Sequence, residues 1–390
     1  MQFSCDRKEL LTAARRATKA AAPRTTPVPA LSGILLQADA SNFELTLTAT
    51  NLEIAISSSV AAPVSESGGV VVDAGLLADM LSLLEGQTIE VQSQPGNQIL
   101  LSGGNASYLV AGLSEKAFPI LQIPDGSPAV QVSRLNGLAR QTVFAAAKSG
   151  STPLRCVKLE IQPDHLRAIG CDGNLLSFAK REVSGGQPME LLIPSSSFSV
   201  LTGLAGEDDQ LLLTADDKQA VFRCPQKNWI FSTQLGMGSY LDVDAVLTGI
   251  DKRYEAITDA ASLKQVLGEM TVLSNTDSAI PPLICLTFSS GEISVSAENE
   301  YGSARDAIAA QVSTPTPPGG FYYLGKKLLL GLRAMGGEIR LSLSGSGILL
   351  ATCGEQTFLL TPNRNPSLSA SKRAKVPKKS KGQTKKAKAA

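Results

Sequence analysis

The sequence predicts an α+β protein made of three similar domains, each built from two helix-plus-sheet half-units. The first observation is a repeat: a helix-like segment leading into apolar strands starts at Leu10, at Leu135 and at Leu263, about every 120 to 130 residues. The second is another kind of unit, a short strand followed by a helix, which starts at residues 70, 191 and 321. The third is the length of 390 residues, which fits two or three domains; the repeat selects three. Six such units imply a symmetric, curved object, which a catalytic pocket rarely needs.

The helix that opens each repeat carries an apolar face. Apolar side chains recur there at the spacing of neighbouring helical turns: Leu10, Leu11 and Ala14; Leu135, Leu138 and Val143; Leu263, Val266 and Leu267. One face of each helix is therefore expected to pack on a sheet.

Alternating apolar strands fill the space between the helices. Residues 87–94 and 98–103 form one such pair, and residues 210–215 and 219–224 another, each joined by a turn containing Gly, Asn or Asp. Strands of adjacent units can pair edge to edge, giving a continuous outer sheet with the helices on its other side; this also hides strand edges that would promote aggregation.

Two junctions have the composition of linkers: residues 118–130, rich in Pro and Gly, and the stretch from Thr248 to Asp251. The predicted domains are therefore 1–126, 127–249 and 250–365. A Pro-rich loop at residues 313–320 falls inside the third domain.

The last 25 residues differ from the rest in charge. Nine of the 36 Lys and Arg lie in residues 366–390, which contain no acid. The other 27 stand against 35 Asp and Glu, so the remaining chain has a net charge of −8. With almost no apolar content, residues 366–390 are predicted to be a disordered basic tail. The tail is either a solubilising extension or an electrostatic contact for DNA.

The six cysteines indicate a reducing compartment. They are far apart, never form a CxxC motif, and fall mostly in apolar, strand-like runs: Cys5, Cys156, Cys171, Cys224, Cys285 and Cys353. Reduced, buried thiols are favoured over metal ligands or disulfides. The first residues are polar and charged by residue 6, and no run of 18 apolar residues occurs, so we expect a cytoplasmic protein without a signal peptide or membrane span.

Residues for catalysis are hard to find. The single histidine, His165, is expected in a solvated turn, and no nucleophile elbow, P-loop or paired metal-ligand spacing occurs. The glycine-rich stretches at Gly103 and Ser344 are expected to be hairpin turns rather than phosphate-binding loops. The acids of residues 207–209 are expected to be a solvated charge run. An enzyme is not predicted, and an unrecognised hydrolase is the weakest alternative.

Basic residues gather on several predicted helices. They are Arg15, Arg16 and Lys19 on the first, Arg134 and Arg140 on the third, and Lys326, Lys327 and Arg333 on the last. These are either ordinary solvated faces or contacts to phosphates, which carry no sequence information. Aromatic residues are 5% of the chain and do not interleave with basic ones, so stacking platforms for single strands are not expected.

Along residues 1–365 the chain resembles the β sliding clamp of bacterial DNA polymerase III. The resemblance is carried, in order, by residues 1–11, residues 29–56, the Phe118–Pro119 pair, and residues 171–176, 272–275 and 359–365. It implies a DNA-clamp fold, with helices lining the inside of a ring and sheets outside. It also implies a head-to-tail homodimer that encircles double-stranded DNA, is opened by a clamp-loader ATPase, and tethers the replicative polymerase and repair proteins.

Such a clamp is a replication processivity factor and a non-catalytic accessory subunit of a DNA-directed DNA polymerase, associated with the nucleoid. It has no catalytic residue, metal or cofactor of its own. The chain is then a divergent clamp, or an extra copy beside another. The alternative is a clamp-like scaffold that binds protein partners without encircling DNA.

The resemblance also assigns DNA contacts. Arg24 matches a pore-loop arginine, and Lys148 lies where the family has a polar DNA-contacting loop. With the basic helix residues, the predicted DNA-binding set is Arg24, Lys148, Arg15, Arg16, Lys19 and Arg140. At Gly75 and Ser196 the family commonly has basic contacts and this chain has none, so DNA binding is expected to be weaker there.

A pocket for short partner peptides with apolar ends is implied between the second and third domains. The matching positions are Leu154, Cys171, Gly173, Asn174, Leu175, Leu176, Leu241, Val246, Leu324, Lys327, Gly347, Leu349, Leu359, Leu360, Thr361, Pro362, Asn363 and Arg364. The apolar floor of the pocket is retained, and an extended peptide suits it. Its rim departs from the family pattern, with Leu175 and Ala245 where arginines are frequent, and Thr361 and Asn363 where methionines flank the proline. The alternative is that Leu154, Leu241 and Leu360 are ordinary core.

The seam between two copies is the last implied site. Tyr108 and Val110 match apolar interface positions of the first domain, and Val272 and Leu273 match their partners in the third. A head-to-tail contact that closes after two copies would bury both patches. Ordinary strand packing explains an aromatic at residue 108 equally well.

Overall fold

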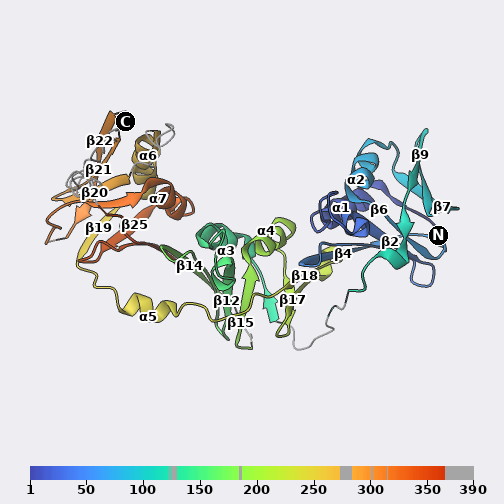
Figure 1. The fold of residues 1–390 in the computed structure, drawn as a ribbon, viewed down its shortest axis with the longest axis horizontal. Helices are drawn as coiled ribbons and strands as arrows, with labels where there is room; N and C mark the ends of the chain where they lie inside the picture. The colour runs from blue at the N-terminus through green and yellow to red at the C-terminus, as the bar shows by residue number, and fades with distance from the viewer. Residues whose placement is uncertain are drawn as a thin grey trace, which may run out of the picture. The chain divides into compact units, whose positions relative to one another are not determined.

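The computed structural model describes residues 1–121, 123, 130–183, 187–272, 283–299, 302–313 and 315–364. The chain divides into two compact units, shown in Figure 1. Unit 1 comprises Met1–Val243 and Gly354–Thr357; unit 2 comprises Asp244–Cys353 and the residues from Phe358 onward. Leu273 and the tail at 366–390 lie outside the described residues, so the predictions for them stay predictions. The three predicted domain ranges also stay a prediction.

Unit 1 repeats one arrangement of helices and strands twice. Its first half contains β1 (Gln2–Asp6), α1 (Arg7–Thr18), β2 (Gly33–Asp39), β3 (Glu44–Thr50), β4 (Ile54–Ala61), β5 (Val64–Glu66), β6 (Gly68–Asp73), α2 (Ala74–Leu83), β7 (Thr88–Gln94), β8 (Gln98–Gly103), β9 (Ala106–Ala111) and β10 (Leu113–Ser114). Its second half contains β11 (Val130–Val132), α3 (Leu135–Thr142), β12 (Cys156–Ile161), β13 (His165–Cys171), β14 (Leu175–Glu182), β15 (Met189–Pro194), α4 (Ser195–Leu204), β16 (Leu211–Ala215), β17 (Gln219–Cys224) and β18 (Trp229–Gln234). Short 3-10 turns lie at Pro29–Ser32, Glu115–Ala117, Val143–Ala145, Pro153–Arg155 and Pro225–Lys227.

One sheet of nine strands runs through both halves of unit 1. Its order is β10-β6-β2-β3-β4-β18-β17-β16-β11. The halves join where β4 and β18 pair antiparallel, with Ser58 opposite Trp229 and Ile56 opposite Phe231. The edge-to-edge pairing expected from the sequence is therefore present within unit 1, and neither half leaves that strand edge open.

The first helix shows why these segments fold as they do. The Asp6 carboxylate caps α1 by accepting hydrogen bonds from the backbone N–H groups of Lys8 (2.8 Å) and Glu9 (3.1 Å). Because of this cap, α1 begins at Arg7, three residues before the expected start. Its alanine-rich inner face is buried among the strands of the same half, and small side chains let the helix lie close to them.

Unit 2 is built in the same way. It contains α5 (Val243–Thr248, the first residue of which belongs to unit 1), β19 (Tyr254–Asp259), α6 (Ala260–Thr271), β20 (Leu283–Ser289), β21 (Glu292–Asn299), β22 (Gly302–Ala309), β23 (Gln311–Val312), β24 (Phe321–Leu324), α7 (Gly325–Leu332), β25 (Glu338–Leu343), β26 (Leu349–Cys353) and β27 (Gln356–Leu360, the first two residues of which belong to unit 1). One sheet has the order β22-β21-β20-β24, and the other includes β26, β25, β19 and β23 in that order. Helices α6 and α7 lie side by side in Figure 1.

Several local predictions are confirmed and three are corrected. All six cysteines lie in strands as free thiols, four buried and two half-buried. Gly103 and Ser344 lie at hairpin turns, as expected. His165 is not in a turn: it is the first residue of β13. The expected linker after Thr248 is preceded by α5, and α3 is shorter than its apolar pattern because the chain tightens into a 3-10 turn at Val143. Among the described residues, no helix is both long and apolar enough to cross a membrane.

Candidate nucleic-acid interface

Arg24 lies in the loop after α1 and is held by an acid at the start of α2. Its Nε donates to Asp73 Oδ2 (2.8 Å) and its Nη2 to Asp73 Oδ1 (2.7 Å), a two-pronged pair that orients the guanidinium. Asp73 Oδ1 also accepts the backbone N–H of Leu76, so the same carboxylate caps α2. The Arg24 side chain remains 71% exposed. Arg24, the predicted DNA contact, is thus exposed, and Asp73 fixes the orientation of its guanidinium group.

Arg16 and Lys19 fasten the end of α1 to the second half of unit 1. Arg16 Nη1 donates to the carbonyl oxygen of Lys227 (3.2 Å), and Lys19 Nζ donates to the carbonyl oxygen of Gly203 (2.7 Å) at the end of α4. Partial burial lowers the pKa of the Arg16 guanidinium, against the opposing effect of nearby Cys224 and Asp209. These two side chains therefore hold the halves together as well as carrying positive charge.

Arg140 pairs with one of the acids that the sequence placed in a solvated run. Its Nη2 lies 2.8 Å from Glu207 Oε1, and both side chains are about two-thirds exposed. Asp209, two residues on, is mostly buried and lies 2.7 Å from Lys227 Nζ. The expectation of a solvated charge run is confirmed for the exposed Glu207 and Asp208 and is wrong for Asp209, which is mostly buried against Lys227.

Two of the predicted DNA-binding residues, Arg15 and Lys148, are exposed and differ from the others in their interactions. Arg15 is exposed on α1, and Lys148 is exposed in the loop after α3. Neither makes an ion pair or side-chain hydrogen bond with the part of the chain that the structure describes. A phosphate can bind either one without displacing an internal partner.

Helices α2 and α4 present no basic residue to solvent. The exposed residues of α2 include Leu76, Asp79 and Leu83, and those of α4 include Ser196 and Ser199. Ser196 Oγ lies 3.5 Å from Glu53 Oε1. The absence of basic residues noted at Gly75 and Ser196 thus extends over the exposed faces of both helices, and the weaker DNA binding expected there stays a prediction.

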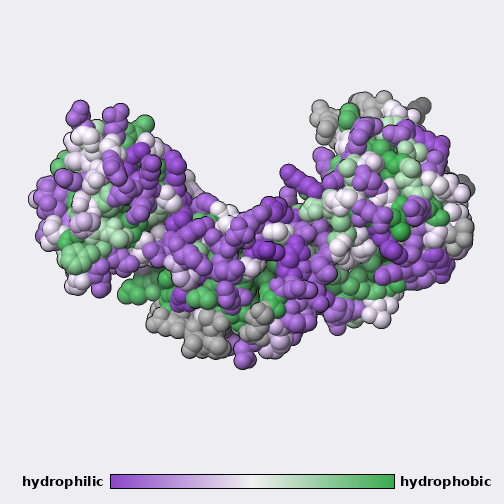
Figure 2. All heavy atoms as spheres, turned by 180° about the vertical axis from the view of Figure 1, so that it is seen from behind, coloured by the Kyte–Doolittle hydropathy of each residue, from purple (hydrophilic) through white to green (hydrophobic). Residues whose placement is uncertain are grey.

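Figure 1 shows α1 beside α2 and α3 beside α4 in unit 1. Among these four helices, basic residues lie only on α1 and α3, and further ones lie in the loops that follow those two helices. In the view of Figure 2, hydrophilic side chains cover most of the surface and apolar patches are scattered among them.

The predicted peptide-binding residues of unit 1 lie mostly at the β13–β14 turn. Gly173 has φ +93° there, a conformation that favours glycine, and the Asp172 carboxylate accepts the backbone N–H groups of Asn174 and Leu175. Cys171, Leu175 and Leu176 are buried. By contrast, Leu154 is half-buried and Leu241 is exposed.

The predicted peptide-binding residues of unit 2 are partly core. Leu349, Leu359 and Leu360 are buried, as is Gly347, whose carbonyl oxygen accepts the hydroxyl of Tyr323 at 2.7 Å. The partly or fully exposed members are Val246, Leu324, Lys327, Thr361, Pro362, Asn363 and Arg364. Asn363 is fixed by its backbone N–H, which donates to the Tyr322 carbonyl oxygen (2.7 Å).

The predicted seam residues differ in accessibility. Strand β9 is at the edge of the sheet β5-β1-β7-β8-β9. On it Tyr108 is half-buried and Val110 is buried in the core of unit 1, while Leu109, on the opposite face, is 60% exposed. Val272, directly after α6, is exposed. The side chain of Val110 is thus unavailable to a second copy, and the exposed features of this edge are Leu109 and the strand backbone.

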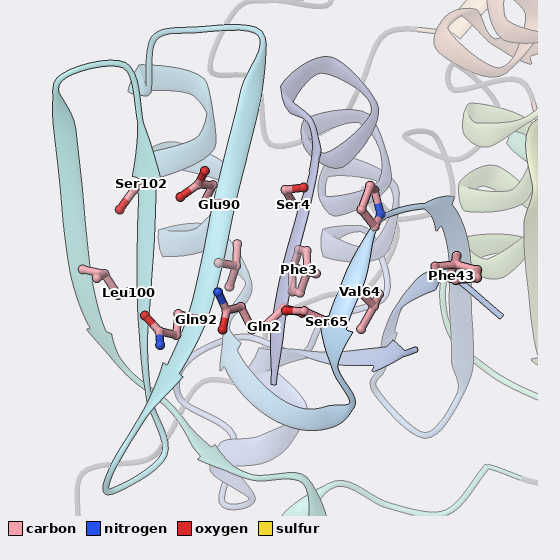
Figure 3. Close-up of a pocket in the computed structure, with 12 residues that line it drawn as sticks. Gln2, Phe3, Ser4, Phe43, Val64, Ser65, Glu90, Gln92, Leu100 and Ser102 are labelled. Atoms are coloured by element: carbon pink, nitrogen blue, oxygen red, sulfur yellow. The ribbon is translucent and has the colours of Figure 1, made fainter. Parts of the chain in front are cut away.

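A groove on the same five-stranded sheet was not predicted. It has a volume of about 370 Å³ and is lined by the outward side chains of β1, β5, β7 and β8 with Phe43 nearby. Figure 3 shows Gln2, Ser4, Glu90 and Gln92 along it. Its amides, hydroxyls and single carboxylate offer no cation to a phosphate. Within the described residues, no group of three or more His, Cys, Asp or Glu is arranged to hold a metal ion.

The sequence is similar to those of known proteins of one kind. Residues 1–122 match the family model of the N-terminal domain of the DNA polymerase III beta subunit. The beta sliding clamp of Bacillus subtilis is 24% identical over 92% of this chain and 98% of its own length. That of Synechococcus elongatus is 31% identical over 57% of this chain, a match that spans 62% of that relative.

Solved structures agree on the fold. The crystal structure of the DNA polymerase sliding clamp from Bacillus subtilis superimposes with a TM-score of 0.87 at 22% identity, covering 94% of this chain and 99% of that one. The DNA polymerase III subunit beta from Pseudomonas aeruginosa gives 0.85 at 21% identity, covering 94% and 100%. The predicted α+β clamp fold is confirmed, and the chain has the architecture of a DNA-clamp protein. Its sequence is similar to those of the beta sliding clamps of bacterial DNA polymerase III, as expected from the motifs described above.

Proposed function

We propose that the chain is a DNA replication processivity factor: a ring of two copies that encircles duplex DNA and tethers a DNA polymerase. The observation that carries this proposal is the set of exposed cationic side chains on α1, α3 and their following loops, joined to no base-reading or catalytic feature among the described residues. The clamp fold and the names of the relatives support the same function.

The chemistry of these cations suits a sliding contact. An exposed ion pair such as Arg140–Glu207 contributes only about 0–1 kcal/mol, so a phosphate can exchange with the carboxylate at little cost. Contacts to phosphates carry no sequence information and weaken with salt. DNA would be retained by topology while each contact stays exchangeable. The predicted DNA-binding residues, Arg24, Lys148, Arg15, Arg16, Lys19 and Arg140, are proposed in this role.

Ring closure would join two copies head to tail through free strand edges. Strand β9 ends one sheet of unit 1 and β22 ends one sheet of unit 2. Edge strands pair readily with another chain because their backbone groups on that side are unpaired. Tyr108, Leu109 and Val272 supply side chains near these elements. A clamp-loader ATPase would open the ring, and polymerase and repair proteins would dock through short peptides at the predicted peptide-binding residues, with the protein cytoplasmic and nucleoid-associated.

Topology gives the decisive experiment. The full chain is loaded with a clamp loader onto nicked circular DNA, separated from free protein by gel filtration, and the circle is then cut with a restriction enzyme. We expect co-elution with the circle and release after linearisation. Binding that survives linearisation, or a chain that stays monomeric at micromolar concentration, would contradict the ring.

A second candidate is a clamp-like scaffold that binds protein partners but does not encircle DNA. The exposed faces of α2 and α4 favour it, because they carry no basic residue that could contact a phosphate. On α2 the exposed side chains include the apolar Leu76 and Leu83. In the same experiment a scaffold would bind partner peptides and would not be retained on the circle.

A further inference from the structure

Three acids follow α4 in a loop on which basic residues converge. Lys19 Nζ reaches the carbonyl oxygen of Gly203 at the end of α4, Arg140 Nη2 reaches Glu207, and Lys227 Nζ reaches Asp209. The loop therefore places negative charge among the cations that the proposed function assigns to DNA. Each of its acids has a different environment.

Asp209 is structural. Its side chain is 11% exposed, it accepts the backbone N–H of Gly206 at 2.8 Å, and it pairs with Lys227. Burial by itself would raise the pKa of Asp209, but the hydrogen bonds from Lys227 and Gly206 outweigh it, so the pKa lies below its ordinary value. This acid shapes the loop and stays ionised.

Glu207 has no such structural duty. Its side chain is 66% exposed, and its contact with the described residues is the ion pair with Arg140. Asp208, next to it, is exposed and makes no ion pair or side-chain hydrogen bond with that part of the chain. Glu207 and Asp208 therefore differ in one respect: Glu207 occupies a guanidinium and Asp208 does not.

We propose that Glu207 competes with DNA phosphate for Arg140 and so lowers the affinity of the chain for duplex DNA. A carboxylate and a phosphate present similar oxygen acceptors to the planar guanidinium group, so one can replace the other. Because the pair is exposed and weak, phosphate displaces Glu207 at a small cost rather than being excluded. The pair would keep one contact of the sliding interface weak. This inference rests on the proposed function.

The test compares two variants that change the net charge equally. Glu207→Gln and Asp208→Asn each remove one negative charge from the same loop, so long-range electrostatics changes alike and only Glu207→Gln frees Arg140. Binding of the full chain to a fluorescent duplex of mixed sequence is followed by anisotropy over a range of salt concentrations. We expect Glu207→Gln to bind about two- to fivefold tighter than Asp208→Asn at low salt, with the difference shrinking as salt rises.

A second background identifies Arg140 as the group released. In an Arg140→Gln chain, Glu207→Gln and Asp208→Asn should have equal affinities, which makes a double-mutant cycle. Equal affinities with Arg140 present would overturn the proposal, and weaker binding by Glu207→Gln would show that Glu207 positions Arg140 instead. If the unmodified chain binds no duplex at any salt concentration, this inference is overturned, and the proposed function is decided separately by retention on the nicked circle. Failure of this inference alone leaves that retention intact.

Discussion

Asp73, the last residue of β6, caps α2 and accepts two hydrogen bonds from Arg24, one on each carboxylate oxygen. The hydrogen bond from Arg24 is the main cause that lowers the pKa of Asp73, and the N–H of Leu76 adds to it against the effect of partial burial. One acid therefore sets the start of a helix and the direction of a proposed DNA contact.

Replacing Asp73 should separate these two duties. Asp73→Ala loses the cap and the ion pair and should lower the free energy of unfolding by about 1–2 kcal/mol at pH 7. Asp73→Asn keeps a capping oxygen and should cost less than about 1 kcal/mol. Because the pKa is lower in the folded chain, the carboxylate stabilises the fold above the unfolded value near ~4, and this is lost as pH falls through the folded pKa. The Ala penalty measured by urea unfolding should therefore shrink in acid; a penalty independent of pH would contradict this account. Asp79→Asn, on the same helix, is the control.

Two glycines in the helices of unit 2 should respond to alanine with opposite signs. A Cβ at Gly331 of α7 would overlap the ring of buried Phe358, whereas a Cβ at Gly268 of α6 meets nothing within 4 Å. Gly331→Ala should destabilise the chain by about 1–3 kcal/mol. Gly268→Ala should stabilise it by roughly 0.5–1 kcal/mol, since alanine restricts the unfolded chain and favours helix. Urea unfolding checks both, and equal effects would refute the packing of α7 against Phe358.

The slope of log K for DNA binding against log salt concentration should report the number of phosphate contacts. Arg15→Gln and Lys148→Gln should each weaken duplex binding and reduce the magnitude of the slope of log K against log salt by about 0.9. Neither side chain gives up a partner in the described residues, so folding stability should hardly change. Lys218→Gln, an exposed lysine in the β16–β17 turn, should leave the slope unaltered. A slope that falls equally in all three variants would argue for diffuse attraction rather than contacts by Arg15 and Lys148.

The basic tail should add affinity that salt removes. Deleting residues 366–390 takes away nine positive charges and no negative ones. We expect weaker duplex binding at low salt and little difference above physiological ionic strength, because screening removes exposed charge–charge attraction. Unchanged affinity at low salt would make the tail a solubilising extension.

The cysteines should react at different rates. Burial, with help from nearby Asp6 and Glu9, raises the pKa of the Cys5 thiol to about 12, and burial raises that of Cys156 to about 11. Since the thiolate is the reactive form, iodoacetamide at pH 8 should label half-buried Cys353 well before Cys5 or Cys156. Mass spectrometry of the native chain measures this, and the unfolded chain, in which all six should react, is the control.

The sequence predicted the architecture because its evidence is periodic. Apolar spacing fixed the helices that begin each repeat, and the alternation of strands such as β16 and β17 predicted antiparallel pairs, which the structure contains. The start of α1 was misplaced because one polar side chain, Asp6, decides it rather than the apolar pattern. Helix α5 was missed because it is only six residues long and ends at Thr248, where the predicted linker begins.

The candidate site was less accessible to sequence reasoning. Basic residues were identified by type, but their partners come from distant parts of the chain: Asp73 for Arg24, Glu207 for Arg140 and the Lys227 carbonyl for Arg16. No local spacing predicts such pairs, because packing of separate elements creates them. Likewise, a residue number does not tell which face of β9 is outward, so Val110 was expected at a seam although its side chain is buried.

The pairing of β4 with β18 means that the two halves of unit 1 do not depend on the covalent link between β10 and β11 to stay together. If the chain were cut within residues 122–129, the two fragments would still be joined by the antiparallel pairing of β4 with β18, which involves five residue pairs from Ser58–Trp229 to Ile54–Thr233. Co-expressing the chain as two pieces split in that connection should consequently reconstitute the unit.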